Sequence, residues 1–181
     1  MPFANCDGHW VGRYYYAGGR KIALEEDGEH VGIDTARAPT DPAVSRASSA
    51  WRLPGGILVV PTSSLEASDI VRLKASGALR PAFRPAVLPR VGPDQTLLIP
   101  LPEVRVEVDD EPQRDAVRRA LKTWRHKVVV SSSSSERVVL VPASGDPMDA
   151  LDLANAIHER AHPAAASVRF VQVVKRRANK P

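Results

Sequence analysis

The stretch Glu103-Val-Arg-Val-Glu-Val108 alternates apolar and charged residues with a period of two, which is typical of a β-strand with one buried face. Asp109, Asp110 and Glu111 follow and lead into Pro112, and acid followed by proline favours the start of a helix. The helix expected next carries one apolar stripe, made of Ala116, Val117, Ala120, Leu121 and Trp124. This stretch therefore predicts a strand that leads into an amphipathic helix.

The residues after this helix predict a hairpin, a second helix and a last strand. The β-branched runs His126-Lys-Val-Val-Val130 and Arg137-Val-Val-Leu-Val141 predict the hairpin, with the serine run Ser131 to Ser135 as a flexible polar loop. Asp146-Pro147 repeats the acid-then-proline start, and Ser167-Val-Arg-Phe-Val-Gln-Val-Val174 predicts the last strand. The resulting order β-α-β-β-α-β defines a ferredoxin-like unit.

The first half of the chain repeats this plan with a weaker periodicity. Tyr14-Tyr-Tyr16, the turn Ala17-Gly18-Gly19 and Lys21-Ile-Ala-Leu24 predict a hairpin. The elements expected after it are a strand from about His30 to Asp34, a short helix within 40–50, a strand Ile57-Leu-Val-Val60, a serine-capped helix from Ser64 to Ser76 and an extended segment 78–88. We interpret the first half as a looser copy of the second, which gives two β-α-β-β-α-β units in series.

We therefore expect an α+β protein of two tandem ferredoxin-like βαββαβ sandwiches with antiparallel sheets, preceded by a β-hairpin arm. The expected boundaries are an arm at 1–28, a first subdomain and linker at 29–100, a second subdomain at 101–175 and a basic tail at 176–181. A length of 181 residues fits one domain or two small ones.

Composition excludes several classes of protein. The single Cys6 excludes an intramolecular disulfide framework and a zinc site built on paired cysteines. A net charge of +4 is too mild to indicate a nucleic-acid partner by itself. The N-terminus lacks the apolar run of a signal peptide, and the longest apolar stretches are far shorter than the ~20 residues that span a bilayer. We expect a soluble cytoplasmic protein without a membrane partner.

The predicted hairpin of the second half is apolar on both faces, because Val128 to Val130 and Val138 to Val141 run without interruption. In a two-layer sandwich the helices cover only one face of the sheet, so something else must cover the other. The other unit, a second copy of the chain or a different protein could do so. The candidate sheet contacts are Val128, Val130, Val139, Val141, Phe170 and Gln172.

Four segments together carry a resemblance: Tyr14 to Leu24, Leu53-Pro-Gly-Gly-Ile-Leu-Val-Val60, Leu101-Pro-Glu-Val-Arg-Val-Glu-Val108 and Leu153-Ala-Asn-Ala-Ile-His-Glu-Arg160. In this order they resemble the N-terminal propeptide region of bacterial subtilisin-like serine proteases of the fervidolysin type. The resemblance implies subdomains that fold first, dock an open sheet face on a protease and place a C-terminal segment in its cleft.

Carried over to this sequence, the cleft segment is the tail from Lys175 to Pro181, so Lys175, Arg176 and Arg177 join the candidate partner contacts. A terminal proline departs from the family pattern, and the family continues into a protease where this sequence ends. The resemblance therefore implies a separately encoded serine protease as partner, with the chain acting as inhibitor, folding assistant or adaptor.

The sequence indicates no catalytic residue and no cofactor. The His-Gly-Thr and Gly-Thr-Ser-Met-Ala segments of subtilisin-like proteases are missing, and Asp34 in Ile33-Asp34-Thr35-Ala36 lacks the expected glycine. No glycine-rich phosphate-binding signature is present, and Cys6 lies in a polar N-terminal arm without a paired His or Lys pattern, so we expect a free thiol rather than a nucleophile. We expect a protein that is not an enzyme.

Two alternatives remain open from the residues. His158-Glu159-Arg160-Ala161-His162 matches the His-Glu-x-x-His pattern of zinc hydrolases, although Glu159 falls opposite the apolar stripe and the sequence after His162 offers no third ligand. The basic cluster Lys175-Arg176-Arg177 could instead serve an RNA-binding ferredoxin-like sheet, yet the last predicted strand offers only Phe170 for stacking. We prefer a solvated tail and two helix-edge histidines. A homodimer is a further alternative.

Overall fold

The computed structural model describes residues 12–47, 50–86 and 96–174, and it divides into two compact units. Unit 1 comprises residues 1–24 and 100–169, and unit 2 comprises residues 25–99 and 170–181. The chain passes between them within three strands, β2 (Arg20–Asp34), β6 (Thr96–Glu107) and β9 (Ala165–Val174). The protein is an α+β structure with four α-helices and a mostly antiparallel sheet in its described part.

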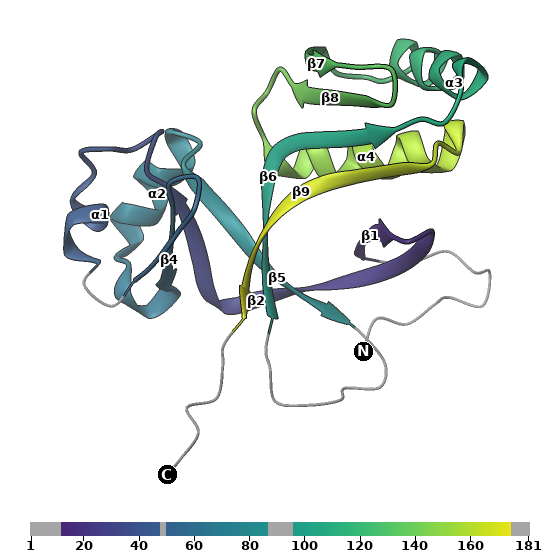
Figure 1. The fold of residues 1–181 in the computed structure, drawn as a ribbon. Helices are drawn as coiled ribbons and strands as arrows, with labels where there is room; N and C mark the ends of the chain where they lie inside the picture. Colours follow the sequence, from purple (N-terminus) through teal and green to yellow (C-terminus); the bar gives the residue numbers. More distant parts are fainter. Residues whose placement is uncertain (1–11, 48–49, 87–95, 175–181) are drawn as a thin grey trace. The chain divides into compact units, whose positions relative to one another are not determined.

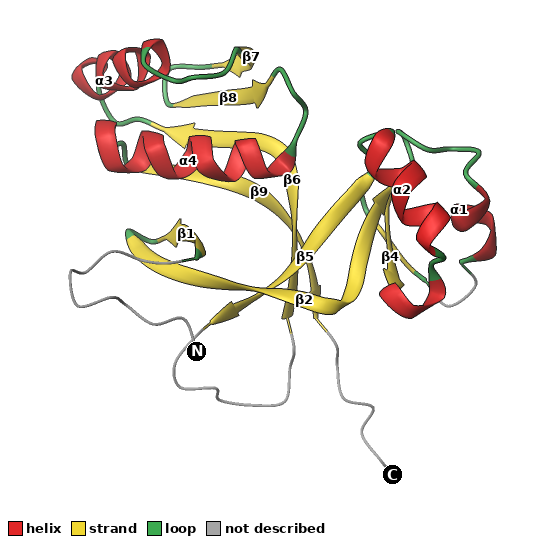
Figure 2. Ribbon diagram, turned by 180° about the vertical axis from the view of Figure 1, so that it is seen from behind, coloured by secondary structure: helices red, strands yellow, loops and turns green. Residues whose placement is uncertain are grey.

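Unit 1 shows the strand and helix order that the sequence predicts for the second half (Figures 1 and 2). After β6 come α3 (Glu111–Lys122), β7 (Val128–Ser133), β8 (Arg137–Pro142), α4 (Pro147–Ala161) and β9. The neighbour order in the sheet is β9-β6-β8-β7, with β6 and β7 both antiparallel to β8. The expected β-α-β-β-α-β order is confirmed for this half.

The core of unit 1 follows from the period-two alternation of its strands. Val104 and Val106 lie opposite Leu140 and Val138 in the β6–β8 register, and all four side chains are buried. The apolar side of α4 is buried as well, and it consists of Ala150, Leu151, Leu153, Ala154, Ile157 and Ala161. Because α3 packs on α4, both helices belong to the layer that covers this face of the sheet. Side chains alternate along a strand, so the residues between the buried ones on β6 and β8 point to the opposite face.

Both acid-then-proline signals start helices as the sequence predicts. Asp110 accepts a hydrogen bond from the backbone N–H of Gln113 at 2.8 Å, and Asp146 accepts one from Met148 at 2.8 Å. α4 ends where His162 adopts a left-handed conformation with φ of 47°, directly before Pro163. The starts of the two longest helices in the described part of the chain are therefore set by local sequence.

The predicted hairpin in the first half is confirmed, with β1 (Arg13–Ala17) antiparallel to the start of β2. Gly18 and Gly19 form the turn with φ of 54° and 74°, values that glycine adopts without steric cost. Residues 13–24 belong to unit 1, where Asn155 of α4 donates a hydrogen bond to the backbone carbonyl of Tyr14. The hairpin thus packs on α4.

Unit 2 contains the same order of elements as unit 1. After β2 come α1 (Pro42–Arg46), β3 (Trp51–Leu53), β4 (Ile57–Pro61), a 3-10 turn η1 (Thr62–Ser64), α2 (Ala67–Ala75) and β5 (Leu79–Ala86). Neighbouring strands run in the order β3-β4-β2-β5, so the first and third strands of this set are central, as they are in unit 1. Its core is built from Ile33, Leu58, Val60 and Leu73, with alanines and partly buried neighbours around them.

Four details differ from the sequence predictions, and one of them is β3, a strand that the sequence did not predict. The cap of α2 is Glu66 rather than Ser64: Glu66 and Asp69 exchange side-chain-to-backbone hydrogen bonds in a capping box, while Ser64 binds the carbonyl of Pro61. The serine run is not all loop, because β7 continues to Ser133 after a bulge. The strand predicted from His30 already begins at Arg20, since β1 pairs with its first part.

A buried ion pair holds the end of β2 to β5 in unit 2. Arg80 is 1% exposed, and its guanidinium donates to Asp34 Oδ2 at 2.8 Å and to the Gly77 carbonyl at 2.6 Å. Gly32 makes room for this contact, because a Cβ there would lie 3.1 Å from Cβ of Arg80 and 3.0 Å from Cγ2 of Ile99. The Asp34 side chain therefore has a structural partner.

No helix in the described part of the chain is long and apolar enough to cross a membrane.

We predict that Asp34→Asn lowers the free energy of unfolding by about 3 kcal/mol, because the buried guanidinium of Arg80 loses the charge that compensates its desolvation. Urea denaturation measures the change. Asp115→Asn is the control, since Asp115 pairs with Arg118 at the surface and its loss should cost less than about 1 kcal/mol. Equal effects of the two substitutions would contradict the role given to Asp34.

Candidate functional site

The face of unit 1 that the helices leave uncovered carries three apolar side chains, which we call the valine strip: Val129, Val139 and Val141. Val129 of β7 lies opposite Val141 of β8, and Val139 is the next outward-facing residue on β8. Val139 and Val141 are partly buried, and Val129 is 50% exposed. The strip is thus an apolar surface on the sheet rather than part of the core.

Charged side chains surround the valine strip on the neighbouring strands. Arg105 of β6 lies opposite Val139, and its guanidinium is 3.0 Å from Glu103. Glu103 also pairs with Arg169 of β9 at 3.2 Å, and Glu107 pairs with Arg137 at 3.2 Å. Exposed pairs of this kind add little stability, and they place charges of both signs around the valine strip.

The candidate sheet contacts named from sequence fall on different surfaces. Val139 and Val141 lie on the uncovered face, whereas Val128 and Val130 are in register with Pro142 and Leu140 on the helix-facing side. Val130 is nevertheless 55% exposed, because β7 is the last strand of its sheet. Sequence reasoning missed Val129, although the unbroken apolar run 128–130 shows that both faces of this strand carry valine.

The remaining partner candidates belong to unit 2 or lie outside the described residues. Phe170 is partly buried and Gln172 is exposed, and both belong to the part of β9 that lies in unit 2. Lys175, Arg176 and Arg177 lie outside the described residues, as does Cys6. Of the predicted contact set, the structure therefore places only Val139 and Val141 together on the uncovered face of unit 1.

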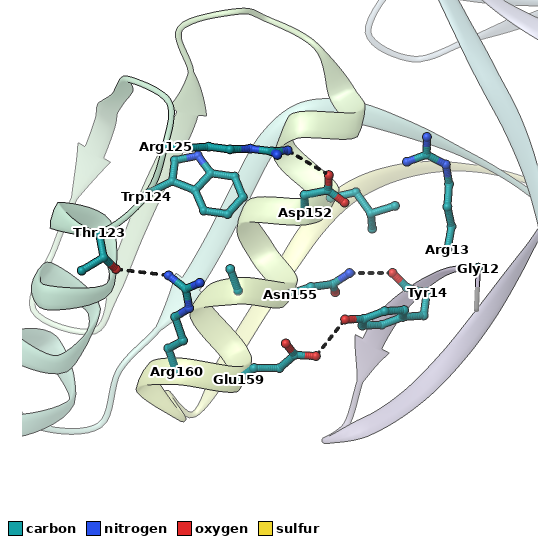
Figure 3. A pocket seen from close by; sticks show the side chains of 12 residues that line it. Gly12, Arg13, Tyr14, Thr123, Trp124, Arg125, Asp152, Asn155, Glu159 and Arg160 are labelled. Atoms are coloured by element: carbon teal, nitrogen blue, oxygen red, sulfur yellow. Dashed lines mark hydrogen bonds and ion pairs between the residues drawn. The ribbon is translucent and has the colours of Figure 1, made fainter. Parts of the chain in front are cut away.

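A pocket of about 500 Å³ lies beside α4 in unit 1, between β1 and the segment that follows α3 (Figure 3). Three arginines and two carboxylates line it. Arg125 is 3.8 Å from Asp152, and Arg160 donates a hydrogen bond to Thr123 at 3.2 Å. Burial raises the pKa of Asp152, and the charges of Arg13 and Arg125 partly offset this effect. The pocket is polar, with charges of both signs on its wall.

Next to this pocket, Glu159 of α4 binds side chains of the β1–β2 hairpin. The hydroxyls of Tyr14 and Tyr16 donate to Glu159 Oε1 at 2.8 and 3.0 Å, and Lys21 Nζ lies 3.7 Å from the same oxygen. Burial and the hydrogen bond to the Glu159 carboxylate raise the pKa of Tyr14 far above its ordinary value. Glu159 therefore lies on the exposed side of α4, as expected, but its carboxylate is a structural acceptor for the arm.

The three residues of the His-Glu-x-x-His match occupy different environments. The ring of His158 stacks on Tyr16 with centroids 3.9 Å apart, Glu159 binds the tyrosines, and His162 ends the helix. Among the described residues, the imidazole nitrogens and the carboxylate oxygens of these three side chains do not form a cluster close enough to hold one metal ion. Burial and the neighbouring His162 charge lower the pKa of His158, because both disfavour its protonated form.

We predict that the free energy of unfolding decreases as the pH falls below the unfolded-state pKa of His158, about 6.5. The folded state holds this pKa lower, so the unfolded chain binds the proton first and is favoured on acidification. His158→Phe keeps a ring against Tyr16 without titrating, so its stability should change less between pH 7 and pH 5. Urea unfolding at both pH values tests this, and identical losses for the two proteins would contradict it.

Unit 2 contains one group of described side chains with the spacing of a metal site, formed by Asp27, Glu29 and His30. His30 Nδ1 lies 2.8 Å from Asp27 Oδ2, both residues are buried, and the His30 ring stacks on Trp51. Arg84 Nη2 lies 2.6 Å from Asp27 and 3.2 Å from Glu29. A metal ion would have to displace this guanidinium, so we interpret the group as an ion-paired network. The spacing Asp27-x-x-His30 was a signal that sequence reasoning did not use.

Comparisons of the chain with protein-family models, with curated proteins and with solved structures find no match.

Proposed function

We propose that this protein is a non-enzymatic protein-binding module that resembles a protease propeptide and acts in trans on a subtilisin-like or related serine protease. Its role there is that of inhibitor, folding assistant or adaptor. The observation that carries the proposal is the valine strip, an apolar surface on a sheet whose opposite face is already covered by helices. The resemblance of four sequence segments to the propeptide region supplies the class of partner.

The order of strands in both units supports the architecture that this role requires. In each unit, a β-α-β-β-α-β series forms a sheet in which the first and third strands are central and the second and fourth flank them. This arrangement supports tandem ferredoxin-like sandwiches. Such a sandwich covers one face of its sheet with two helices and leaves the other available to a partner.

The chemistry of the uncovered face fits a protein partner. Apolar burial contributes about 25 cal/mol per Å², and valine side chains held in a strand lose little entropy on binding. The paired charges of Glu103, Arg105 and Arg169 border the strip and can set the orientation of a partner. An apolar centre with a charged rim is the usual anatomy of a protein interface.

We predict that the purified chain forms a complex with subtilisin and that Val139→Asp weakens it at least about tenfold, because a carboxylate in an apolar interface loses its hydration. Isothermal titration calorimetry measures the affinity, and hydrolysis of a chromogenic peptide separates an inhibitor from an adaptor. Recovery of refolded subtilisin in the presence of the chain detects a folding assistant.

Val71→Asp is the matched control, since Val71 is 67% exposed on α2 in unit 2 and is not part of the valine strip. Urea unfolding of each variant shows whether the fold is intact. No complex with subtilisin, or an equal effect of both substitutions, would count against the proposal.

A further inference from the structure

The strand β7 has one edge without a partner in the described part of the chain, because the sheet order of unit 1 ends with β7. Ala143 N donates to the Lys127 carbonyl at 2.9 Å, so the backbone groups of Lys127 face β8. In an antiparallel pair this pattern alternates, and Val129, two residues later, faces β8 as well. The N–H and C=O groups of Val128 and Val130 therefore point outward from the sheet.

The side chains along this edge are apolar. Val129 is 50% exposed on one face of the strand and Val130 is 55% exposed on the other. No charged residue occurs from Val128 to Ser135. Natural edge strands are protected by charges, prolines or bulges, and here Lys127 and the bulge between Val130 and Ser132 protect only the two ends. Val128 to Val130 thus form a short edge that can accept another strand.

The chain that leads into this edge is strongly basic. Residues 116–135 contain five Lys and Arg residues and no Asp or Glu. Arg118 pairs with Glu111 and Asp115, and Arg125 lies 3.8 Å from Asp152. The other three, Arg119, Lys122 and Lys127, are exposed and have no carboxylate partner among the described residues. Their charge favours an acidic ligand.

We propose that the free edge of β7 receives an extended acidic segment of the partner protein by strand addition, which deepens the protein-binding function and rests on it. The backbone of the segment pairs with Val128 and Val130, and its apolar side chains cover Val129 and Val130. Its carboxylates meet Arg119, Lys122 and Lys127. A second copy of this chain fits less well, because it brings the same excess of positive charge.

Fluorescence anisotropy with two labelled synthetic peptides tests the proposal: one alternates valine with aspartate, and the other alternates valine with lysine. We expect the acidic peptide to bind, with an affinity that falls as salt rises, and the basic peptide not to bind. Val130→Pro removes an outward N–H and should weaken binding at least about tenfold. Val130→Thr keeps that N–H, and we expect it to weaken binding only about two- to threefold.

Substitutions outside β7 test the contact between the basic side chains and the acidic peptide. The triple variant Arg119→Gln, Lys122→Gln and Lys127→Gln should bind the acidic peptide at least about tenfold more weakly and with little dependence on salt. Val71→Thr, at an exposed valine in unit 2, should leave binding unchanged. Equal binding of the acidic and basic peptides, or unchanged binding by both Val130→Pro and the triple variant, would overturn the proposal.

The same variants separate this inference from the proposed function. If Val139→Asp abolishes binding to subtilisin while Val130→Pro and the triple variant leave it intact, the valine strip is the docking surface and the edge proposal fails. If the acidic peptide binds but subtilisin does not, the choice of protease fails and strand addition stands. A dimer in light scattering that Val130→Pro dissociates would show that β7 pairs with itself, which overturns the acidic segment as its occupant.

Discussion

The structure depends on a one-sided covering of the unit 1 sheet. Val104, Val106, Val138 and Leu140 face α3 and α4 and lose contact with water, and this burial fixes which residues of each strand point outward. Because side chains alternate with a period of two, the apolar residues between the buried ones must face the other side. On β8 these are Val139 and Val141. The valine strip is therefore exposed because β8 is apolar on both faces and the helices α3 and α4 cover only one of them.

The edge of β7 and the valine strip meet at Val129, which is exposed on the uncovered face and lies on the last strand of the sheet. A partner that covers the strip and adds a strand to β7 would bury this residue from two directions. The two surfaces use different chemistry, since the strip offers side chains and the edge offers backbone groups. The proposed partner would therefore be recognised by shape on one surface and by strand pairing and charge on the other.

Polar contacts in both units connect particular segments of the chain. Glu159 is the common acceptor for the hairpin tyrosines, and Arg80 neutralises Asp34 at the end of β2. In the third case, Asp27 is shared between His30 and Arg84. In each of these contacts a charged group already has a protein partner of opposite charge or a hydrogen-bond donor. This explains why patterns that resemble an Asp-Thr motif or a zinc motif have structural roles in this fold.

Neighbouring residues alone were enough to predict the order of elements in the second half, the hairpin turn at Gly18 and Gly19 and the starts of α3 and α4, but not the short strand β3 in the first half. These features depend on alternation within a strand, on an acid that caps a helix and on a glycine that tolerates positive φ. Contacts between distant parts of the chain determine which valines are open, that Glu159 accepts from the hairpin tyrosines and that Asp34 meets Arg80. Periodicity within one element contains no information about such contacts, because they require residues far apart in the chain to approach one another.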